Sequence, residues 1–306
     1  MEGINMILPN WSCKHDVLIQ SDDGSRQPMD VPYFQAVQIA PETWQIESDG
    51  DYSYLLAGEE EAILIDSGYG CGNIREYCQS LTSKPLKNVV NTHEHFDHTA
   101  NNFYFENAYM SEYCSLHASI PFNSFSGMTF PRDYPRIIVE EGDVIPLKGR
   151  ELDVLEVRDH APGSLLFLDR SHRLLFAGDE LRPVKPLKVS VEKYMQYMEK
   201  LMLCRSDFDT ICTGMGLFDA NIIDDCLTAC KKVLAGETGE TLDPSPAPEP
   251  VLTDEQGRTV FLRRRARPVD KTPSKSPFPS DSMRKLCVNG TGIVYSTENI
   301  FNSPVA

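Results

Sequence analysis

Four side chains that can bind a metal ion lie within six residues of one another: His93, His95, Asp97 and His98. Imidazoles and a carboxylate crowded in this way must be solvated, paired or bound to metal, which argues against an ordinary polar loop. Side chains at i and i+2 of an extended segment point to the same side, which brings His93, His95 and Asp97 together. His98 then faces another way. The spacing therefore suits two neighbouring metal ions, one bound by the first two histidines and the other by Asp97 and His98.

The elements around this cluster predict where it lies in the fold. A buried-type strand at 88–92 runs directly into the histidines, and open α/β sheets usually present their functional residues on loops that follow strands. The pattern of short strands followed by a helix occurs once before about residue 135 and again after it. We expect strands at 36–40, 43–47, 52–58, 61–68, 88–92, 136–147, 151–157, 164–169, 173–179 and 209–214, and helices at 73–81, 191–203 and 221–234. Two such halves predict an α/β fold, a four-layer αββα sandwich with helices outside and two sheets inside.

Changes in composition divide the chain into three parts. We expect an N-terminal extension at 1–35, a catalytic domain at 36–240, and a proline-rich linker with a C-terminal arm at 241–306. The boundary rests on DPSPAPEP at 243–250, which cannot continue a helix. The arm contains an expected strand at 290–296 and is predicted to pack near the active-site mouth, on its own domain or on a second subunit of a homo-oligomer.

Charge and composition exclude several classes of partner. The formal net charge of −16 would repel a phosphate backbone, so we expect no nucleic-acid substrate. No apolar stretch approaches the roughly 18 residues that a membrane span needs, and the first residues lack the basic region of a signal peptide. The nine cysteines are scattered without the spacing of a zinc ribbon or a small secreted scaffold, which favours reduced thiols. The prediction is a cytoplasmic protein that acts on a small molecule.

The segment THEHFDHT at 92–99 resembles the HxHxDH signature of the metallo-β-lactamase superfamily, and further segments agree in order and spacing over roughly residues 36–235. The resemblance implies that Asp66, in LIDSG, supports a ligand loop. It also implies that His160, in DHAPGS, completes the first metal site and that Asp179, in FAGDEL, bridges the two metals. By this resemblance, the predicted metal ligands are His93, His95, Asp97, His98, His160 and Asp179. Asp97 is also expected to orient the nucleophile.

One segment departs from the family pattern. Family members usually present a last histidine in a strand-end GHG segment, and here the corresponding residues are Gly214, Met215 and Gly216. A thioether is a poor replacement for imidazole on Zn²⁺ or Mn²⁺. Three roles stay open for Met215, a weak ligand, a hydrophobic wall of the substrate pocket or no role in the site, and we favour the wall. The second site then retains fewer protein ligands and should bind metal more weakly than the first. One or two Zn²⁺ per chain are expected, with Mn²⁺ or Fe²⁺ as alternatives.

The resemblance implies a metal-dependent hydrolase that uses a metal-bound hydroxide on an ester, thioester, lactone or amide of a small molecule. Thioester hydrolysis of the glyoxalase II type has the closest ligand pattern. The alternative is a mononuclear non-haem iron oxidoreductase of the persulfide dioxygenase type, with iron held by His93, His160 and Asp179. A third hypothesis is a binding domain that has lost catalysis, and retention of most ligand types argues against it.

Overall fold

A computed structural model describes residues 17–20, 25–28, 34–48, 51–68, 73–118, 134–242, 252–253, 255, 259–262 and 278–302. The proline-rich segment at 243–250 and most of the N-terminal extension lie outside these residues. In the described part of the chain, no helix is long and apolar enough to cross a membrane.

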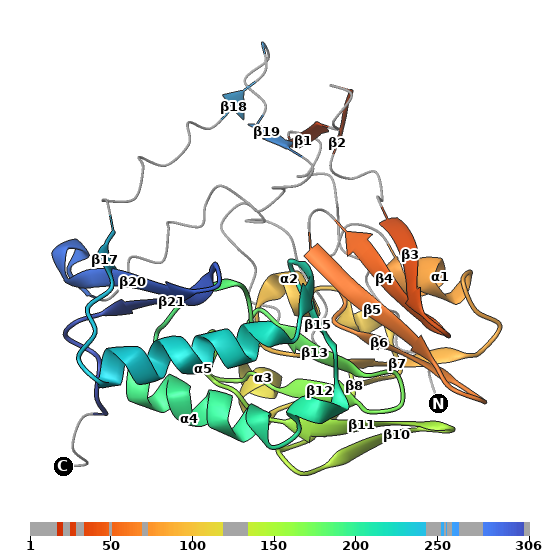
Figure 1. The fold of residues 1–306 in the computed structure, drawn as a ribbon. Coiled ribbons are helices and arrows are strands. Elements are labelled where there is room, and N and C mark those ends of the chain that lie inside the picture. The colour runs from red at the N-terminus through yellow and green to blue at the C-terminus, as the bar shows by residue number, and fades with distance from the viewer. Residues whose placement is uncertain are drawn as a thin grey trace.

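Two sheets lie face to face in the centre of the molecule (Figure 1). The first has seven strands in chain order: β3 (Phe34–Ala40), β4 (Thr43–Ser48), β5 (Asp51–Ala57), β6 (Ala62–Ile65), β7 (Leu86–Val90), β8 (Asn107–Met110) and β9 (Arg136–Ile138). The second has six: β10 (Val144–Leu147), β11 (Arg150–Leu155), β12 (Leu166–Asp169), β13 (Leu174–Gly178), β15 (Thr210–Thr213) and β16 (Gly216–Asp219).

Helices cover the outer face of each sheet. The first sheet carries α1 (Ile74–Gln79), α2 (Phe96–Thr99) and α3 (Glu112–His117), and the second carries α4 (Val191–Met202) and α5 (Asn221–Leu234). The structure therefore confirms the predicted four-layer α/β sandwich. Short 3₁₀ turns occupy Asn102–Tyr104, Arg205–Asp207 and Ser280–Ser282.

The alternation of side chains along the strands explains these layers. In β6, Ile63 and Ile65 face the core between the sheets, whereas Ala62 and Leu64 face the helices. Successive side chains of a strand point to opposite faces, so a strand that is apolar at every position can be buried on both sides. All four residues of β6 are buried, and the same holds for β12. Runs of this kind identify the two inner sheets.

Two small sheets add to the sandwich. One joins β14 (Val184–Pro186), β17 (Glu240–Thr241), β20 (Met283–Val288) and β21 (Thr291–Ser296) in the order β14-β21-β20-β17, and its β20–β21 hairpin lies on α5. The other joins β1 (Val17–Gln20), β2 (Arg26–Pro28), β18 (Leu252–Thr253) and β19 (Thr259–Leu262). Because Leu286, Ile293 and Tyr295 of the hairpin belong to the core of α4 and α5, residues beyond 240 contribute to that core, and the division at residue 240 stays a prediction.

One expected strand is wrong. The run at 136–147 forms two strands in different sheets, β9 at the edge of the first and β10 at the edge of the second. A turn at Glu140–Asp143, closed by a hydrogen bond from Asp143 N to Glu140 O of 3.1 Å, separates them. The residues before and after this turn are apolar in a similar way, so the sequence reads as one strand. The two strands differ only in the sheet that each one joins.

Candidate metal centre

The histidine segment follows the C-terminal end of β7, which lies between β6 and β8 in the first sheet. Residue 96 starts the short helix α2, which turns the chain back toward the strand end. Two hydrogen bonds hold this turn, from Ser67 N and from the Asn91 side chain to the His98 carbonyl, at 2.8 and 2.9 Å. The segment is buried, with His93 and His98 almost fully shielded from solvent. The turn, rather than a continuous extended segment, therefore sets the directions of these side chains.

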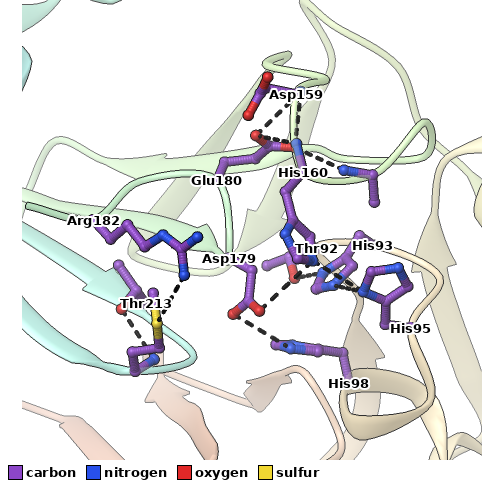
Figure 2. A network of polar contacts seen from close by, with 12 residues as sticks. Thr92, His93, His95, His98, Asp159, His160, Asp179, Glu180, Arg182 and Thr213 are labelled. Atoms are coloured by element: carbon purple, nitrogen blue, oxygen red, sulfur yellow. Dashed lines mark hydrogen bonds and ion pairs between the residues drawn. The ribbon is translucent and has the colours of Figure 1, made fainter. Parts of the chain in front are cut away.

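Three imidazoles converge on one point. His95 Nδ1 lies 3.0 Å from His93 Nε2 and 3.0 Å from His160 Nε2 (Figure 2). One N–H of His95 cannot fill both contacts, so hydrogen bonding alone accounts poorly for the arrangement. Two nitrogens about 2.05 Å from a tetrahedral Zn²⁺ are about 3.3 Å apart. His93, His95 and His160 thus fit the first metal site that the sequence predicts.

The neighbours of His93 fix the nitrogen that carries its proton. Asp66 Oδ2 accepts a hydrogen bond from the Thr92 hydroxyl at 2.7 Å, and Thr92 Oγ1 lies 3.0 Å from His93 Nδ1. Since the hydroxyl proton is directed to the carboxylate, Thr92 can only accept from His93, which places the imidazole proton on Nδ1. The Nε2 lone pair of His93 is then directed at the group of three histidines.

A second group consists of His93, His98 and Asp179, whose possible ligand atoms lie within 4.8 Å of one another. His98 Nδ1 lies 2.7 Å from Asp66 Oδ2, which directs its Nε2 toward Asp179. That nitrogen is buried, makes no hydrogen bond within the described part of the chain, and lies 3.7 Å from Asp179 Oδ1. The geometry leaves room for a cation between the two side chains.

The charges around His98 favour a positive charge there. Burial alone would lower the pKa of His98, but the carboxylate of Asp66, with Asp97 and Asp179, raises it to about 10. The pKa of His160, by contrast, is held well below its usual value by burial. A bound divalent cation would supply the positive charge that the three carboxylates favour, and imidazole and carboxylate are suitable ligands for Zn²⁺, Mn²⁺ or Fe²⁺. The residues present therefore fit a metal ion.

Asp179 lies between the two groups, directly after β13. Its Oδ2 is 3.6 Å from His160 Nε2, while its Oδ1 faces His98 (Figure 2). The preceding Gly178 has a φ of +49° and lies against Thr92, so that a Cβ atom there would be 2.4 Å from Thr92 Oγ1. Only glycine permits this close approach. It brings Asp179 to the position that the resemblance implies for a bridging carboxylate, and bridging itself stays a prediction.

Asp97 lies in the same buried segment as the predicted histidine ligands, next to His98. Asp97 is buried but belongs to neither group of converging ligand atoms, whereas His93 belongs to both. Both carboxylate oxygens of Asp97 are buried and its charge acts on His98, and the pairing expected from the sequence, with Asp97 and His98 on the second metal, stays a prediction. The spacing argument assumed that the side chains lie on an extended segment, whereas helix α2 begins one residue before Asp97.

Met215 lies where the family pattern has a histidine. Its backbone N–H donates to Thr213 Oγ1 at 3.1 Å, and its sulfur lies 4.0 Å from Arg182 Nη1. The side chain is half-buried. The thioether thus faces a guanidinium at the border of the second group, and its role as a pocket wall stays a prediction.

Sequence reasoning missed the side chains that hold the loop of His160. The Glu180 carboxylate accepts the backbone N–H groups of residues 159, 160 and 161. The Glu94 carboxylate accepts that of Gly163 at 3.1 Å. Both glutamates adjoin predicted ligands in the sequence, which was the available signal, but no local pattern shows that they reach across to this loop.

Comparisons with known proteins show the family of the chain. A family model described as "Metallo-beta-lactamase superfamily" matches residues 49–239. An acyl-coenzyme A thioesterase of Homo sapiens is 27% identical, with 41% of this chain and 56% of that protein covered. A probable metallo-hydrolase of Streptococcus pyogenes is 26% identical, with 54% and 72% covered. A metallo-β-lactamase structure from Pontibacter korlensis has a TM-score of 0.50 at 16% identity and covers 65% of this chain and 99% of its own. The chain spans little more than half the length of the thioesterase it matches.

Proposed function

Because the chain belongs to the metallo-β-lactamase superfamily, we propose that it is a metal-dependent hydrolase that cleaves a thioester of a small molecule, with acyl-coenzyme A thioesters as the first candidates. The observation that carries the proposal is the pair of ligand groups that share His93. A divalent cation bound there acts as a Lewis acid on the carbonyl and lowers the pKa of water from about 15.7 to about 7.

The chain's own residues supply the positioning. We propose His93, His95 and His160 as ligands of the first ion, and His98 with Asp179 as ligands of a second. Asp66 holds the protons of His93 and His98 on their Nδ1 atoms, directly or through Thr92, and so keeps both Nε2 lone pairs available. Such outer contacts orient the ligands and raise their basicity.

Asp97 is the proposed orienting group for the attacking water. It is buried, immediately precedes His98 in helix α2 and contributes to the negative potential that His98 experiences. A carboxylate in this position accepts a hydrogen bond from water and can take up its proton as the thioester carbonyl is attacked. This role does not require Asp97 to bind metal.

Two cationic side chains favour an anionic substrate in spite of the acidic surface. Arg182 is half-buried beside Met215, and Lys188 is exposed with its ammonium donating to the His160 carbonyl at 2.5 Å. We propose Arg182 as the contact for a carboxylate or phosphate of the substrate.

A substrate panel tests the proposal. The purified full-length protein, loaded separately with Zn²⁺, Mn²⁺ and Fe²⁺, is assayed with acyl-coenzyme A, S-acylglutathione, aryl ester and lactone substrates. His160→Ala should abolish thioester cleavage, whereas His117→Ala, which changes a histidine on helix α3 outside both groups, should retain it. Preference for esters or lactones, or equal loss in both variants, would contradict the proposal.

One observation favours the iron oxidoreductase alternative. Because His93 belongs to both groups, the second ion has only two ligands of its own, His98 and Asp179, which favours a protein with one filled site. A single filled site with two histidines and a carboxylate is an arrangement used by non-haem iron enzymes. Metal analysis of the protein as purified separates the two functions. About one iron per chain with oxygen consumption on a persulfide would replace the hydrolase proposal, and zinc or manganese with thioester turnover would support it.

A further inference from the structure

A cluster of buried charges lies behind the candidate metal ligands and belongs to neither ligand group. Lys185, in β14, is 1% exposed, and Asp159 and Glu180 are 3% and 1% exposed. The Lys185 ammonium lies 3.1 Å from Asp159 Oδ2 and 3.5 Å from Glu180 Oε2. Burial of charges is unfavourable unless they are paired and hydrogen-bonded, and paired charges are often no more stabilising than apolar residues of the same size. Stability alone therefore does not explain the cluster.

Glu180 holds the loop that carries His160. Its carboxylate accepts the backbone N–H of His160 at 2.8 Å and those of Asp159 and Ala161 at 3.2 Å (Figure 2). Asp159 in turn accepts the backbone N–H groups of Lys188 and Val189, at 2.7 and 2.9 Å. These bonds fix the backbone on both sides of the His160 imidazole, and hydrogen bonds to a charged acceptor are the stronger ones.

Lys185 connects this loop to the segment of Asp179. Besides its two carboxylate partners, its ammonium donates to the Asp179 carbonyl at 3.3 Å. An ammonium group has three donors, so one lysine can bind all three acceptors at once. A single side chain thereby holds the two backbone segments that carry His160 and Asp179. His160 Nε2 lies 3.6 Å from Asp179 Oδ2.

The C-terminal strand β21 fixes the backbone of Lys185. β14 pairs in parallel with β21, with Lys185 opposite Ile293. Hydrogen bonds from Gly292 N to Pro183 O and from Leu187 N to Val294 O, at 2.7 and 2.8 Å, hold both ends of β14. The buried side chains of β21 anchor it in the core under α5. β21 lies outside residues 49–239, which match the family model, and it supports Lys185, which lies inside them.

Resting on the proposed metal-dependent function, we propose that Lys185 is a positioning residue that sets the distance between His160 and Asp179, and that strand β21 holds it in place. Removal of the ammonium frees the two segments from each other and leaves two carboxylates buried together. The direct consequence is weaker metal binding, because His160, a proposed ligand of the first ion, and Asp179, a proposed ligand of the second, no longer keep their positions relative to each other.

The test measures zinc affinity rather than turnover. Lys185→Met keeps the length of the side chain and removes its charge. In a competition titration of the metal-free full-length protein with a chromophoric chelator, the Kd for Zn²⁺ should rise by about 10- to 100-fold, the range typical for loss of an outer contact to a ligand. Lys200→Met is the matched control, since Lys200 lies on α4 and pairs with Glu141 at the surface. Its Kd should not change.

The outcomes separate positioning from folding and from the proposed function. Near-ultraviolet circular dichroism and urea unfolding of the metal-free variants report the fold, and an intact fold with an unchanged Kd in Lys185→Met overturns the inference. Should Lys185→Met not fold, Glu180→Gln carries the test, because an amide oxygen replaces only part of the acceptor for three N–H groups, and an unchanged Kd there also overturns the inference. A native chain that binds no zinc, manganese or iron would overturn both the inference and the proposed function.

Discussion

Replacement of Asp66 by asparagine should weaken metal binding without touching a ligand. Asp66 accepts three buried hydrogen bonds, from Thr92 N at 2.8 Å, from the Thr92 hydroxyl at 2.7 Å and from His98 Nδ1 at 2.7 Å. An asparagine that keeps the first bond with its oxygen presents an NH₂ group to the other two positions. The hydroxyl can rotate and accept, but the imidazole can only satisfy the new donor by moving its proton to Nε2. His98 would then lose the lone pair that we assign to the cation.

The magnitude follows from the hydrogen bond lost. A hydrogen bond to a charged group contributes about 1.5–3 kcal/mol, so failure to keep His98 in its binding tautomer should raise the Kd of the second ion by about 10- to 150-fold. The measurement is a zinc competition titration that resolves both binding steps, with the fold checked by circular dichroism. Asp209→Asn is the control, because that carboxylate is exposed and pairs with Arg173 at the surface. Equal affinities in Asp66→Asn and native protein, or an equal loss in the control, would refute the reasoning.

Three further predictions concern the framework around the centre. Arg150 and Asp169 form a fully buried ion pair at 2.5 Å, and Arg150 also donates to Thr43 Oγ1 in the opposite sheet. Arg150→Met leaves the Asp169 carboxylate buried without this partner and should lower the free energy of unfolding, measured in urea, by about 3–5 kcal/mol. The double variant Arg150→Met/Asp169→Leu should recover most of the lost free energy. Burial would raise the pKa of Asp169, but Arg150, together with Ser171 and His172, lowers it. The contribution of Asp169 to stability is therefore complete above the unfolded pKa of about 3.9 and is lost as the pH falls through the lower folded pKa, so Asp169→Asn should lose less stability than native protein on acidification below pH 4, and an equal loss would contradict this. Gly214→Ala would place a Cβ atom 2.6 Å from Asp179 Oδ1 and 2.9 Å from His98 Cε1. In a calorimetric zinc titration, the Kd of the second ion should rise at least tenfold and that of the first should change little. A similar rise of both Kd values would point to general misfolding.

The chemistry of the centre could be predicted from short segments. The spacing of His93, His95 and His98 after a strand is a local property, as are the runs of alternating apolar residues that define the sheets. Local spacing determines local direction, and apolar periodicity determines which face is buried, so these features identify the ligand segment and the four layers without knowledge of the fold. The positions of His160 and Asp179 came from the resemblance of their segments to a family, and the structure brings both beside the histidine cluster.

Other features depend on segments that meet only in the folded protein. Helix α2 sets the direction of the Asp97 side chain. Lys185 reaches two carboxylates and a carbonyl from β14, a strand that pairs with one more than a hundred residues later in the chain. The sequence determined which residue types could bind metal and on which local segments they lie. The tertiary structure decided which of them converge and what holds them, because those contacts depend on the packing of distant strands, which local spacing does not encode.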